Sequence, residues 1–463
     1  MMTNTTTKRI QELNLLQREY YATGATRDIA FRKSMLRKLL SAIMQWEAPL
    51  YKALWTDLHK SEQEAFLTEV SLVTGEIRNH LKHLSGWART RRKPTPMQML
   101  PSRSRIVTEP LGSALIISPW NYPFQLLLNP LVGAISAGCT ALLKPSPYVP
   151  NVSSVIEEMI KATFDERYIA VVQGNRDVNT ALLELRWDII FFTGSPALGR
   201  IVMTAAAKNL TPVVLELGGK SPCFVTADAD IKLAARRLAW GKALNAGQTC
   251  IAPDYVLIDK RIRDDFVDEY FRQVNALLGE NPQDTEHFVR MVNDKAFERV
   301  KSYIDGPDAS GTVRGGKTDS ATRYIEPTVV LDPMPDSPVM TTEIFGPVLP
   351  ICTYESLDDA ISFVNKREKP LALYFFGKLS EGKRIVRRSS SGGACINDTI
   401  MHIVNDKVPF GGVGNSGMGR YHGKLSFDAF THERAVIITP RSLDLPFRYM
   451  PYRLYKLFRL ILR

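Results

Sequence analysis

The stretch LGSALIISPWNYPFQLLLNPLVGAISAGCTALLK, residues 111–144, decides the fold class. No charged residue lies between Glu109 and Lys144, so the stretch resembles a membrane span. It is interrupted by prolines and asparagines, which are costly in lipid, at Pro119, Asn121, Pro123, Asn129 and Pro130. We therefore expect a buried strand, a loop, a helix and a second buried strand, in that order.

The alternation of strands and helices continues on the C-terminal side. Short apolar runs predict strands at 111–118, 140–144, 169–172, 188–192 and 213–217, and helical spacing predicts helices at 129–137, 152–164, 178–185 and 194–208. A second alternating region has expected helices at 229–246, 263–278, 296–305 and 357–365 and strands at 254–258 and 326–331. Residues 8–90 are expected to be helical. This pattern indicates an α/β fold with mostly parallel sheets and a domain seam near 216–220.

The composition is that of an ordinary globular protein. The chain has 463 residues, of which 44% are hydrophobic and 23% charged, and this excludes a disordered, collagenous or coiled-coil protein. The length predicts roughly two to four domains. The net charge of +11 suits an anionic cofactor, a membrane surface or nucleic acid, but a soluble basic protein is the simplest interpretation, and no nucleic-acid partner is expected. The N-terminus lacks the apolar core of a signal peptide.

The cysteines are few and far apart, at Cys139, Cys223, Cys250, Cys352 and Cys395. They form no CxxC pair and no Cys/His cluster, so neither a disulfide framework nor a metal site is expected. Reduced thiols in a cytoplasmic setting are the expectation.

Two basic segments lie outside the alternating regions. Residues 91–110 are proline-rich and too short for a domain, so we expect a connection that crosses the molecule. Residues 441–463 carry six basic residues and one acidic residue. From Pro451 onward a helical wheel separates apolar from basic residues, which predicts a short amphipathic helix. Such a helix packs on its own domain or a partner subunit, or attaches to an anionic membrane face, and the pattern leaves these alternatives open.

Two glycine-rich segments compete as a phosphate-binding loop. GVGNSG, residues 412–417, matches GxGxxG, but it follows a Pro-Phe pair rather than a strand and leaves too little chain for a dinucleotide domain. We expect a loop near the active site there. FFTGSPALG, residues 191–199, is the better candidate. The predicted strand ends at Phe192, and Gly194 and Ser195 then open a helix whose free N–H groups favour a pyrophosphate. Arg200 stands where an ATP-binding loop ends in lysine followed by serine or threonine, so ATP binding is not expected.

Three residues have the properties of catalytic groups. Cys250 lies in a glycine-containing turn among polar neighbours, where a thiol can be exposed and activated, although most lone cysteines pack in cores. Glu216 lies inside an apolar strand, and such a carboxylate is either a tuned general base or half of a structural salt bridge. Asn121 offers a neutral N–H donor to an oxyanion, or forms a turn.

Together with these residues, a series of motifs resembles the aldehyde dehydrogenase superfamily, most closely its class 3 branch, which includes the fatty aldehyde dehydrogenases. The motifs occur in the family's order and span nearly the whole chain: SPWNYPF (118–124), LLKPS (142–146), FFTGSPALGR (191–200), LELGGKSP (215–222), NAGQTCIAPDY (245–255), EIFGPVLP (343–350) and PFGGVGNSGMGRYHG (409–423).

The resemblance implies a role for each matching residue. Cys250 matches the nucleophile, Glu216 the general base and Asn121 the oxyanion donor. The cofactor residues are, in chain order, Lys144 at the adenine-side ribose, Gly194, Ser195 and Gly199 under the pyrophosphate, Glu343 at the nicotinamide ribose and its aromatic neighbour Phe345.

The resemblance also implies an architecture. A Rossmann-like NAD(P)-binding domain would comprise residues 1–90 and 111–216, and an α/β catalytic domain residues 217–420. A small bridging or oligomerisation element would comprise 91–110 and 421–440 and would serve a homodimer, with 441–463 as the basic tail.

The implied activity is NAD- or NADP-dependent oxidation of aromatic or medium-to-long aliphatic aldehydes to carboxylic acids, through a cysteine thiohemiacetal and a thioester that is hydrolysed with the glutamate as base. The alternatives are a CoA-acylating enzyme on the same scaffold, which would not need Glu216, and a catalytically idle, membrane-associated scaffold. We expect a cytoplasmic enzyme, with peripheral membrane contact through the tail left open.

One departure from the class 3 pattern bears on the cofactor. Class 3 members usually carry a glutamate three residues after the lysine, whereas Pro147 stands three residues after Lys144 here. A carboxylate at that place would repel a 2′-phosphate, so its absence favours use of both NAD and NADP.

Overall fold

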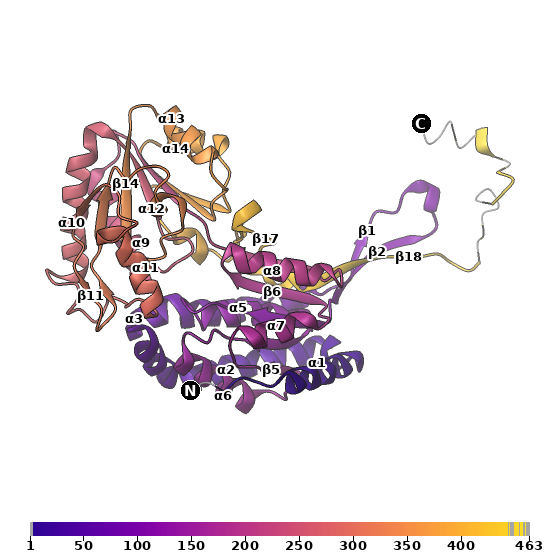
Figure 1. Ribbon diagram of the computed structural model, residues 1–463. Helices are drawn as coiled ribbons and strands as arrows, with labels where there is room; N and C mark the ends of the chain where they lie inside the picture. The colour runs from indigo at the N-terminus through magenta and orange to yellow at the C-terminus, as the bar shows by residue number, and fades with distance from the viewer. Residues whose placement is uncertain (1–2, 443, 445–448, 453, 457–458, 460–463) are drawn as a thin grey trace.

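The computed structural model describes residues 3–442, 444, 449–452, 454–456 and 459. Figure 1 shows two α/β bodies side by side, with a thin arm of strands that projects away from them. The expected α/β fold class is confirmed.

The first body is built on a six-stranded sheet in the order β17-β7-β6-β3-β4-β5. The bounds are β3 Ser113–Ile117, β4 Thr140–Lys144, β5 Ile169–Val171, β6 Ile189–Gly194, β7 Val213–Leu217 and β17 Gly417–Met418. All neighbours are parallel except β17, which runs antiparallel to β7. The quoted stretch 111–144 therefore forms two central strands and the fully buried helix between them, as predicted.

Helices cover this sheet on its faces (Figure 1). They are α1 Thr7–Ala22, α2 Ile29–Leu58, α3 Glu62–Ala65, α4 Ser71–Trp87, α5 Gln125–Ala137, α6 Pro150–Thr163, α7 Arg176–Glu184 and α8 Pro196–Ala207. A π-helical turn, Phe66–Val70, joins α3 to α4. The prediction that residues 8–90 are helical is confirmed for most of that range, and α5 lies beside α2 and α4.

The second body has a seven-stranded sheet in the order β10-β13-β14-β9-β8-β15-β16, parallel except for β10. Its strands are β8 Pro222–Val225, β9 Tyr255–Asp259, β10 Thr312–Arg314, β13 Thr328–Leu331, β14 Val348–Tyr354, β15 Ala372–Phe376 and β16 Gly393–Ile396. The main helices are α9 Ile231–Ala243, α10 Arg263–Leu278, α11 Asp294–Asp305, α13 Leu357–Asn365 and α14 Leu379–Arg388.

One predicted helix ends earlier than expected, and several strands of the second body were not predicted. The helix expected over 229–246 ends at Ala243, because Asn245 and Ala246 adopt left-handed backbone conformations that no helix continues through. The strands β8, β10, β14, β15 and β16 were not predicted, so the sheet of the second body has more strands than the sequence indicated.

The arm consists of β1 Arg91–Lys93, β2 Arg103–Pro110 and β18 Thr431–Ile438, all antiparallel. Within the range 421–440 that was assigned to the bridging element, α15, Lys424–Ala429, packs on α5 of the first body. At Gly133 in α5 an added Cβ would lie 2.7 Å from the Ser426 carbonyl oxygen, so this approach requires glycine. The part of 421–440 that belongs to the arm is therefore β18.

The predicted amphipathic helix of the tail falls mostly outside the described residues. None of the helices that the structure describes combines the length and apolar character needed to cross a membrane.

Candidate active site

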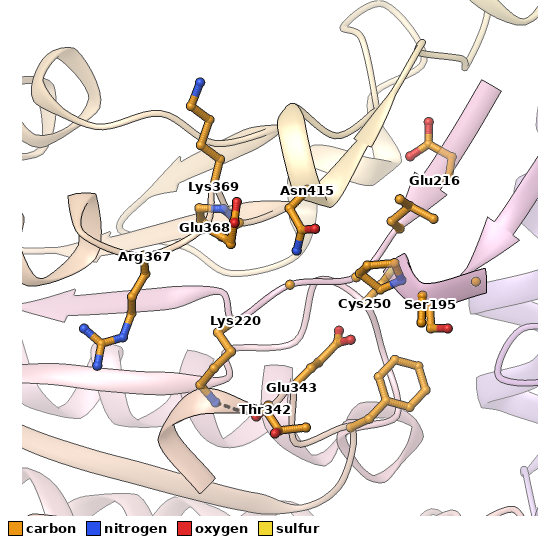
Figure 2. Close-up of a pocket in the computed structure, with 18 of the residues that line it drawn as sticks. Ser195, Glu216, Lys220, Cys250, Thr342, Glu343, Arg367, Glu368, Lys369 and Asn415 are labelled. Atoms are coloured by element: carbon orange, nitrogen blue, oxygen red, sulfur yellow. Dashed lines mark hydrogen bonds between the residues drawn. The ribbon is translucent and has the colours of Figure 1, made fainter. Parts of the chain in front are cut away.

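A cavity of about 960 Å³ opens where the carboxyl ends of β6 and β7 face the second body. Of the residues proposed from the sequence, those that line it are Asn121, Gly194, Ser195, Glu216, Cys250, Glu343 and Phe345. In Figure 2, Glu343 and Asn415 point into the space between them, whereas Arg367 and Lys369 point away from it. The glycine-rich loop that includes Asn415 thus lies at the cavity, as predicted.

The nucleophile candidate lies on a loop whose backbone is unusual. Asn245, Ala246 and Gly247 are consecutive left-handed residues, with φ of 52°, 52° and 72°. An added Cβ at Gly247 would lie 2.3 Å from the Gly346 carbonyl oxygen, so only glycine fits there. This tight turn ends α9 and brings the half-buried Cys250 to the cavity.

The buried side chain of Gln248 holds this loop in place. Its Nε2 donates to the carbonyl oxygens of Asn245 and Arg290, both at 3.1 Å, and its Oε1 accepts from the Val292 N–H at 3.1 Å. Sequence reasoning quoted Gln248 within a motif but gave it no role. A glutamine next to a polar turn gives no sign that two of its three partners, Arg290 and Val292, lie more than forty residues away.

Asn121 is tied to the same loop. Its Nδ2 donates to the Gln248 carbonyl oxygen at 2.9 Å, which leaves the second N–H of the amide for another acceptor. The adjacent Tyr122 hydroxyl shares a hydrogen bond of 2.7 Å with the Thr249 hydroxyl. The oxyanion and nucleophile candidates are therefore fixed relative to each other.

Glu216 occupies β7, opposite Thr193 of β6 and Gly417 of β17. Its side chain is buried, with the residue 3% exposed, and neither carboxylate oxygen has a hydrogen-bond partner among the described residues. Burial raises the pKa of Glu216 well above its usual value. The salt bridge considered from the sequence is not formed with any residue that the structure describes.

The surroundings of Cys250 also disfavour the charged form of its side chain. Burial is the main cause that raises the pKa of the Cys250 thiol to about 12, and the nearby Glu343 and Glu216 are smaller causes. Because the thiolate is the nucleophilic form of a cysteine, this environment favours the less reactive form of Cys250.

Glu343 lies across the cavity. Its pKa is raised to about 8 by burial and by the negative charge of Asp254, and Oε1 has no partner within the described chain. An added Cβ at Gly218 would lie 2.2 Å from Glu343 Oε2, so the Gly218-Gly219 turn leaves room for this carboxylate.

A half-buried lysine fixes the segment that carries Glu343. Lys220 pairs with Asp254 and donates to the Val339 and Thr342 carbonyl oxygens at 2.9 and 3.0 Å, the latter drawn in Figure 2. Asp254 Oδ1 in turn accepts from the Ile344 N–H at 3.0 Å. Lys220 was not predicted as a site residue, although it belongs to a quoted motif.

The start of α8 faces the cavity beside Gly194. Ser195 caps the helix, and its hydroxyl accepts from the Leu198 N–H at 3.5 Å. At Gly199, which does not line the cavity, an added Cβ would lie 2.7 Å from the Leu217 side chain, so glycine brings the helix close to β7. The free N–H groups of this first turn suit an anion.

Phe345 and Lys144 complete the predicted set. Phe345 has a left-handed φ of 49° and meets the Trp120 ring edge-on at 5.4 Å. Lys144 ends β4 and is buried outside the cavity lining, where its Nζ donates to the Pro145 carbonyl oxygen at 2.7 Å. Burial lowers the pKa of Lys144 to about 8.

The remaining cysteines differ from one another. Cys139 and Cys223 are buried, as expected of core residues, whereas Cys352 and Cys395 are half-buried. Cys395 lies 3.4 Å from Nδ1 of His402, a contact that the sequence did not reveal. Within the described ranges, no group of three or more His, Cys, Asp and Glu residues is placed to hold a metal ion.

Residues 8–436 match the sequence model of the aldehyde dehydrogenase family. The chain belongs to this family. It is 45% identical over 448 residues to the 4,4'-diaponeurosporen-aldehyde dehydrogenase of Staphylococcus aureus, covering 95% of this chain and 97% of that protein. It is 44% identical to the dimeric, NADP-preferring aldehyde dehydrogenase of Rattus norvegicus, covering 91% and 92% of the two chains.

Solved structures agree with this assignment. A structure described as the substrate-bound state of Staphylococcus aureus AldH superposes with a TM-score of 0.96 at 44% identity, covering 98% of this aldehyde dehydrogenase and 99% of that chain. Similarity to family 3 members, including human family 3 member B1 at 45% identity over 92% of this chain and 91% of that protein, confirms the class 3 resemblance.

Proposed function

We propose that this aldehyde dehydrogenase oxidises lipophilic aldehydes, aromatic or medium-to-long aliphatic, to carboxylic acids by a hydrolytic mechanism. The observation that supports this most directly is the convergence of Cys250, Glu216 and Asn121 on one cavity. A nucleophile, a carboxylate with a raised pKa and an amide donor are the groups needed for acyl transfer to water.

In the proposed mechanism the Cys250 sulfur adds to the aldehyde carbonyl and forms a thiohemiacetal. The free N–H of the Asn121 amide donates to the alkoxide that develops on the substrate oxygen. A nicotinamide ring, when bound, supplies the hydride acceptor. Glu216, once ionised, takes a proton from a water molecule, which attacks the thioester and releases the acid. The buried position of Glu216 makes it a stronger base than an exposed carboxylate.

The residues fit a nicotinamide dinucleotide, NAD or NADP. The first turn of α8 at Gly194 and Ser195 would hold the pyrophosphate, and Glu343, with Oε1 left without a partner among the described residues, would accept from ribose hydroxyls. Lys144, at the end of β4, would meet the adenine-side ribose, and Phe345 would line the nicotinamide end. Gly199 would allow the helix its close approach to β7.

The substrate class is inferred from the relatives. The Staphylococcus aureus relative is named a 4,4'-diaponeurosporen-aldehyde dehydrogenase, and the match covers 97% of its length. We expect the same preference for extended apolar aldehydes here.

A CoA-acylating activity on the same scaffold remains the second candidate. Glu216 speaks against it, because transfer of the thioester to a thiol needs no base that activates water. The test follows nicotinamide reduction with decanal, with NAD and NADP, in the presence and absence of CoA. Turnover without CoA supports the proposal. Turnover only with CoA would assign the acylating activity. Absence of turnover with both decanal and benzaldehyde would favour the catalytically idle scaffold.

We also propose a homodimer built through the arm. The rat relative is named as dimeric. In this chain β18 and β16 each pair with a single neighbour within the part that the structure describes, and Ile437 and Ile438 of β18 are exposed. Exposed apolar strand edges are surfaces at which a second copy can add. Light scattering of the wild type beside an Ile437→Lys/Ile438→Lys variant tests this, and a monomeric wild type would contradict it.

Membrane contact through the basic tail is proposed as an addition to catalysis. It is tested by flotation with vesicles of anionic phospholipid, using the full chain and a form without residues 446–463. Equal flotation of the two forms would count against the tail.

A further inference from the structure

A buried ion pair lies behind the loop that carries Asn121. Lys60 follows the end of α2, and Glu69 belongs to the π-helical turn before α4. Both side chains are 0% exposed, and Lys60 Nζ lies 2.7 Å from Glu69 Oε1. Because taking two charges out of water is unfavourable, a buried pair of this kind needs further hydrogen bonds to be tolerated.

Those further bonds are made to the Asn121 loop. Lys60 Nζ donates to the Asn121 carbonyl oxygen at 3.1 Å, and Glu69 Oε2 accepts from the N–H groups of Phe124 and Gln125 at 2.8 and 3.3 Å. The pair therefore hydrogen-bonds to the loop at two places, at Asn121 and where α5 begins. Each charged group compensates the charge of the other and also hydrogen-bonds to the backbone of the Asn121 loop.

The same carbonyl is shared with the nucleophile loop. Asn245 Nδ2 donates to the Asn121 carbonyl oxygen and to the Gln248 carbonyl oxygen, both at 3.0 Å. The Asn245 N–H donates to Glu64 Oε1 at 2.9 Å, so the segment between α2 and α4 also reaches the turn before Cys250. This segment is the common support of both loops.

We propose that Lys60, through its pair with Glu69, is a positioning residue for the oxyanion site. It orients the Asn121 peptide so that the second N–H of the side-chain amide, the one not donated to the Gln248 carbonyl oxygen, aims at the alkoxide formed on substrate at Cys250. The inference rests on the proposed roles of Asn121 and Cys250. A displacement of about 1 Å in such a donor lowers a rate by about 100-fold.

The test is a double-mutant cycle of Lys60→Met and Asn121→Ala. The readout is acylation by p-nitrophenyl acetate: the Cys250 thiolate attacks the ester carbonyl, a C–S bond forms, the C–O bond breaks and p-nitrophenolate leaves. No hydride moves, so no cofactor is needed. The amplitude and rate of nitrophenolate release isolate the nucleophile and the oxyanion donor from cofactor binding.

Lys60→Met is expected to slow acylation by roughly 10- to 100-fold, and Asn121→Ala by roughly 100- to 1,000-fold. The double variant is expected to acylate no more than about threefold slower than Asn121→Ala alone, because Lys60 acts through Asn121. Losses that multiply in the double variant would overturn the proposal, and so would a wild-type acylation rate in Lys60→Met.

A matched control separates positioning from folding. Arg32 is a buried cation near the start of α2 that donates to the backbone carbonyls of Thr26, Arg27 and Ser136, at the opposite end of α5 from Asn121. Arg32→Met is expected to lower the melting temperature and leave acylation within about twofold of wild type. An equal loss of acylation in Arg32→Met would show that Lys60 is only one of many structural contacts.

Two further variants keep the test decisive if Lys60→Met does not fold. Lys60→Met/Glu69→Leu removes both charges, which is tolerated better than removing one, and should show the same slow acylation. NADH binding, followed by fluorescence, should stay within about twofold of wild type. Cys250→Ala must abolish the nitrophenolate burst; if it does not, the proposed function fails, whatever the result at Lys60.

Discussion

The two sides of the cavity are built in opposite ways. On the side of Asn121 and Cys250, the side-chain amides donate hydrogen bonds that tie the two loops together, and Gln248 alone makes three hydrogen bonds, although the amide oxygens of Asn121 and Asn245 have no partner among the described residues. On the side of Glu216 and Glu343, carboxylate oxygens stand without partners in the described part of the chain. The first side is organised to hold geometry, and the second keeps its charges available for ligands.

Glu216→Gln gives the largest expected effect and isolates the second side. Thioester hydrolysis is expected to fall by roughly 10²- to 10⁴-fold, because the amide cannot take a proton from water. Acylation by p-nitrophenyl acetate should change little, so a stoichiometric burst should precede a stalled phase. Stability should not fall, since neither carboxylate oxygen has a hydrogen bond to lose among the described residues. Loss of folding in this variant would contradict the contrast between the two sides.

The pH dependence of turnover follows from the same residue. Because burial raises the folded pKa of Glu216, the base is protonated at low pH and becomes active as pH rises through that value. Below the folded pKa, hydrolysis-limited turnover should rise about tenfold per pH unit. Single-turnover decay of a preformed acyl-enzyme measures this directly. A rate that is flat from pH 5 to 9 in the wild type would remove Glu216 from the step.

Gln248→Leu tests the bonded side. The substitution removes three hydrogen bonds and leaves the Val292 N–H and the Arg290 carbonyl buried without this partner. We expect about 2–4 kcal/mol lower unfolding free energy in urea and about tenfold slower acylation. Glu216→Gln is the matched variant, because it should lower activity without lowering stability. A Gln248→Leu protein of wild-type stability would show that the bonds are not needed to hold the loop.

The sequence predicted the parts of the site that depend on local chemistry. Gly194 and Ser195 follow a strand, Glu216 interrupts an apolar run, and Cys250 lies in a polar turn, so each is visible within a few residues. The parallel sheet of the first body followed from the alternation of strands and helices. These features are encoded by neighbours along the chain.

The supports of the site were not predicted, because they join distant segments. Lys60 and Asn121 are 61 residues apart, and Lys220 reaches the Thr342 carbonyl 122 residues away. In a segment expected to be helical, a lysine such as Lys60 is predicted to be exposed to solvent, and only the folded structure shows that it is buried. The left-handed turn at Asn245 and Ala246 was missed for a related reason, since neither residue requires that conformation as glycine would.

Pro147→Glu is the smallest expected effect and tests the cofactor side away from the cavity. Pro147 lies three residues after Lys144, whose buried ammonium bonds to the Pro145 carbonyl oxygen. A carboxylate introduced there would repel a 2′-phosphate and accept from ribose hydroxyls, so it should shift the ratio of kcat/KM values toward NAD by about tenfold. Pro147→Gln is the control, because it can accept hydrogen bonds without charge and should shift the ratio less. Measured ratios that are equal in all three proteins would show that the identity of residue 147 does not set the choice between the two cofactors, and would leave Lys144 as the residue to vary next.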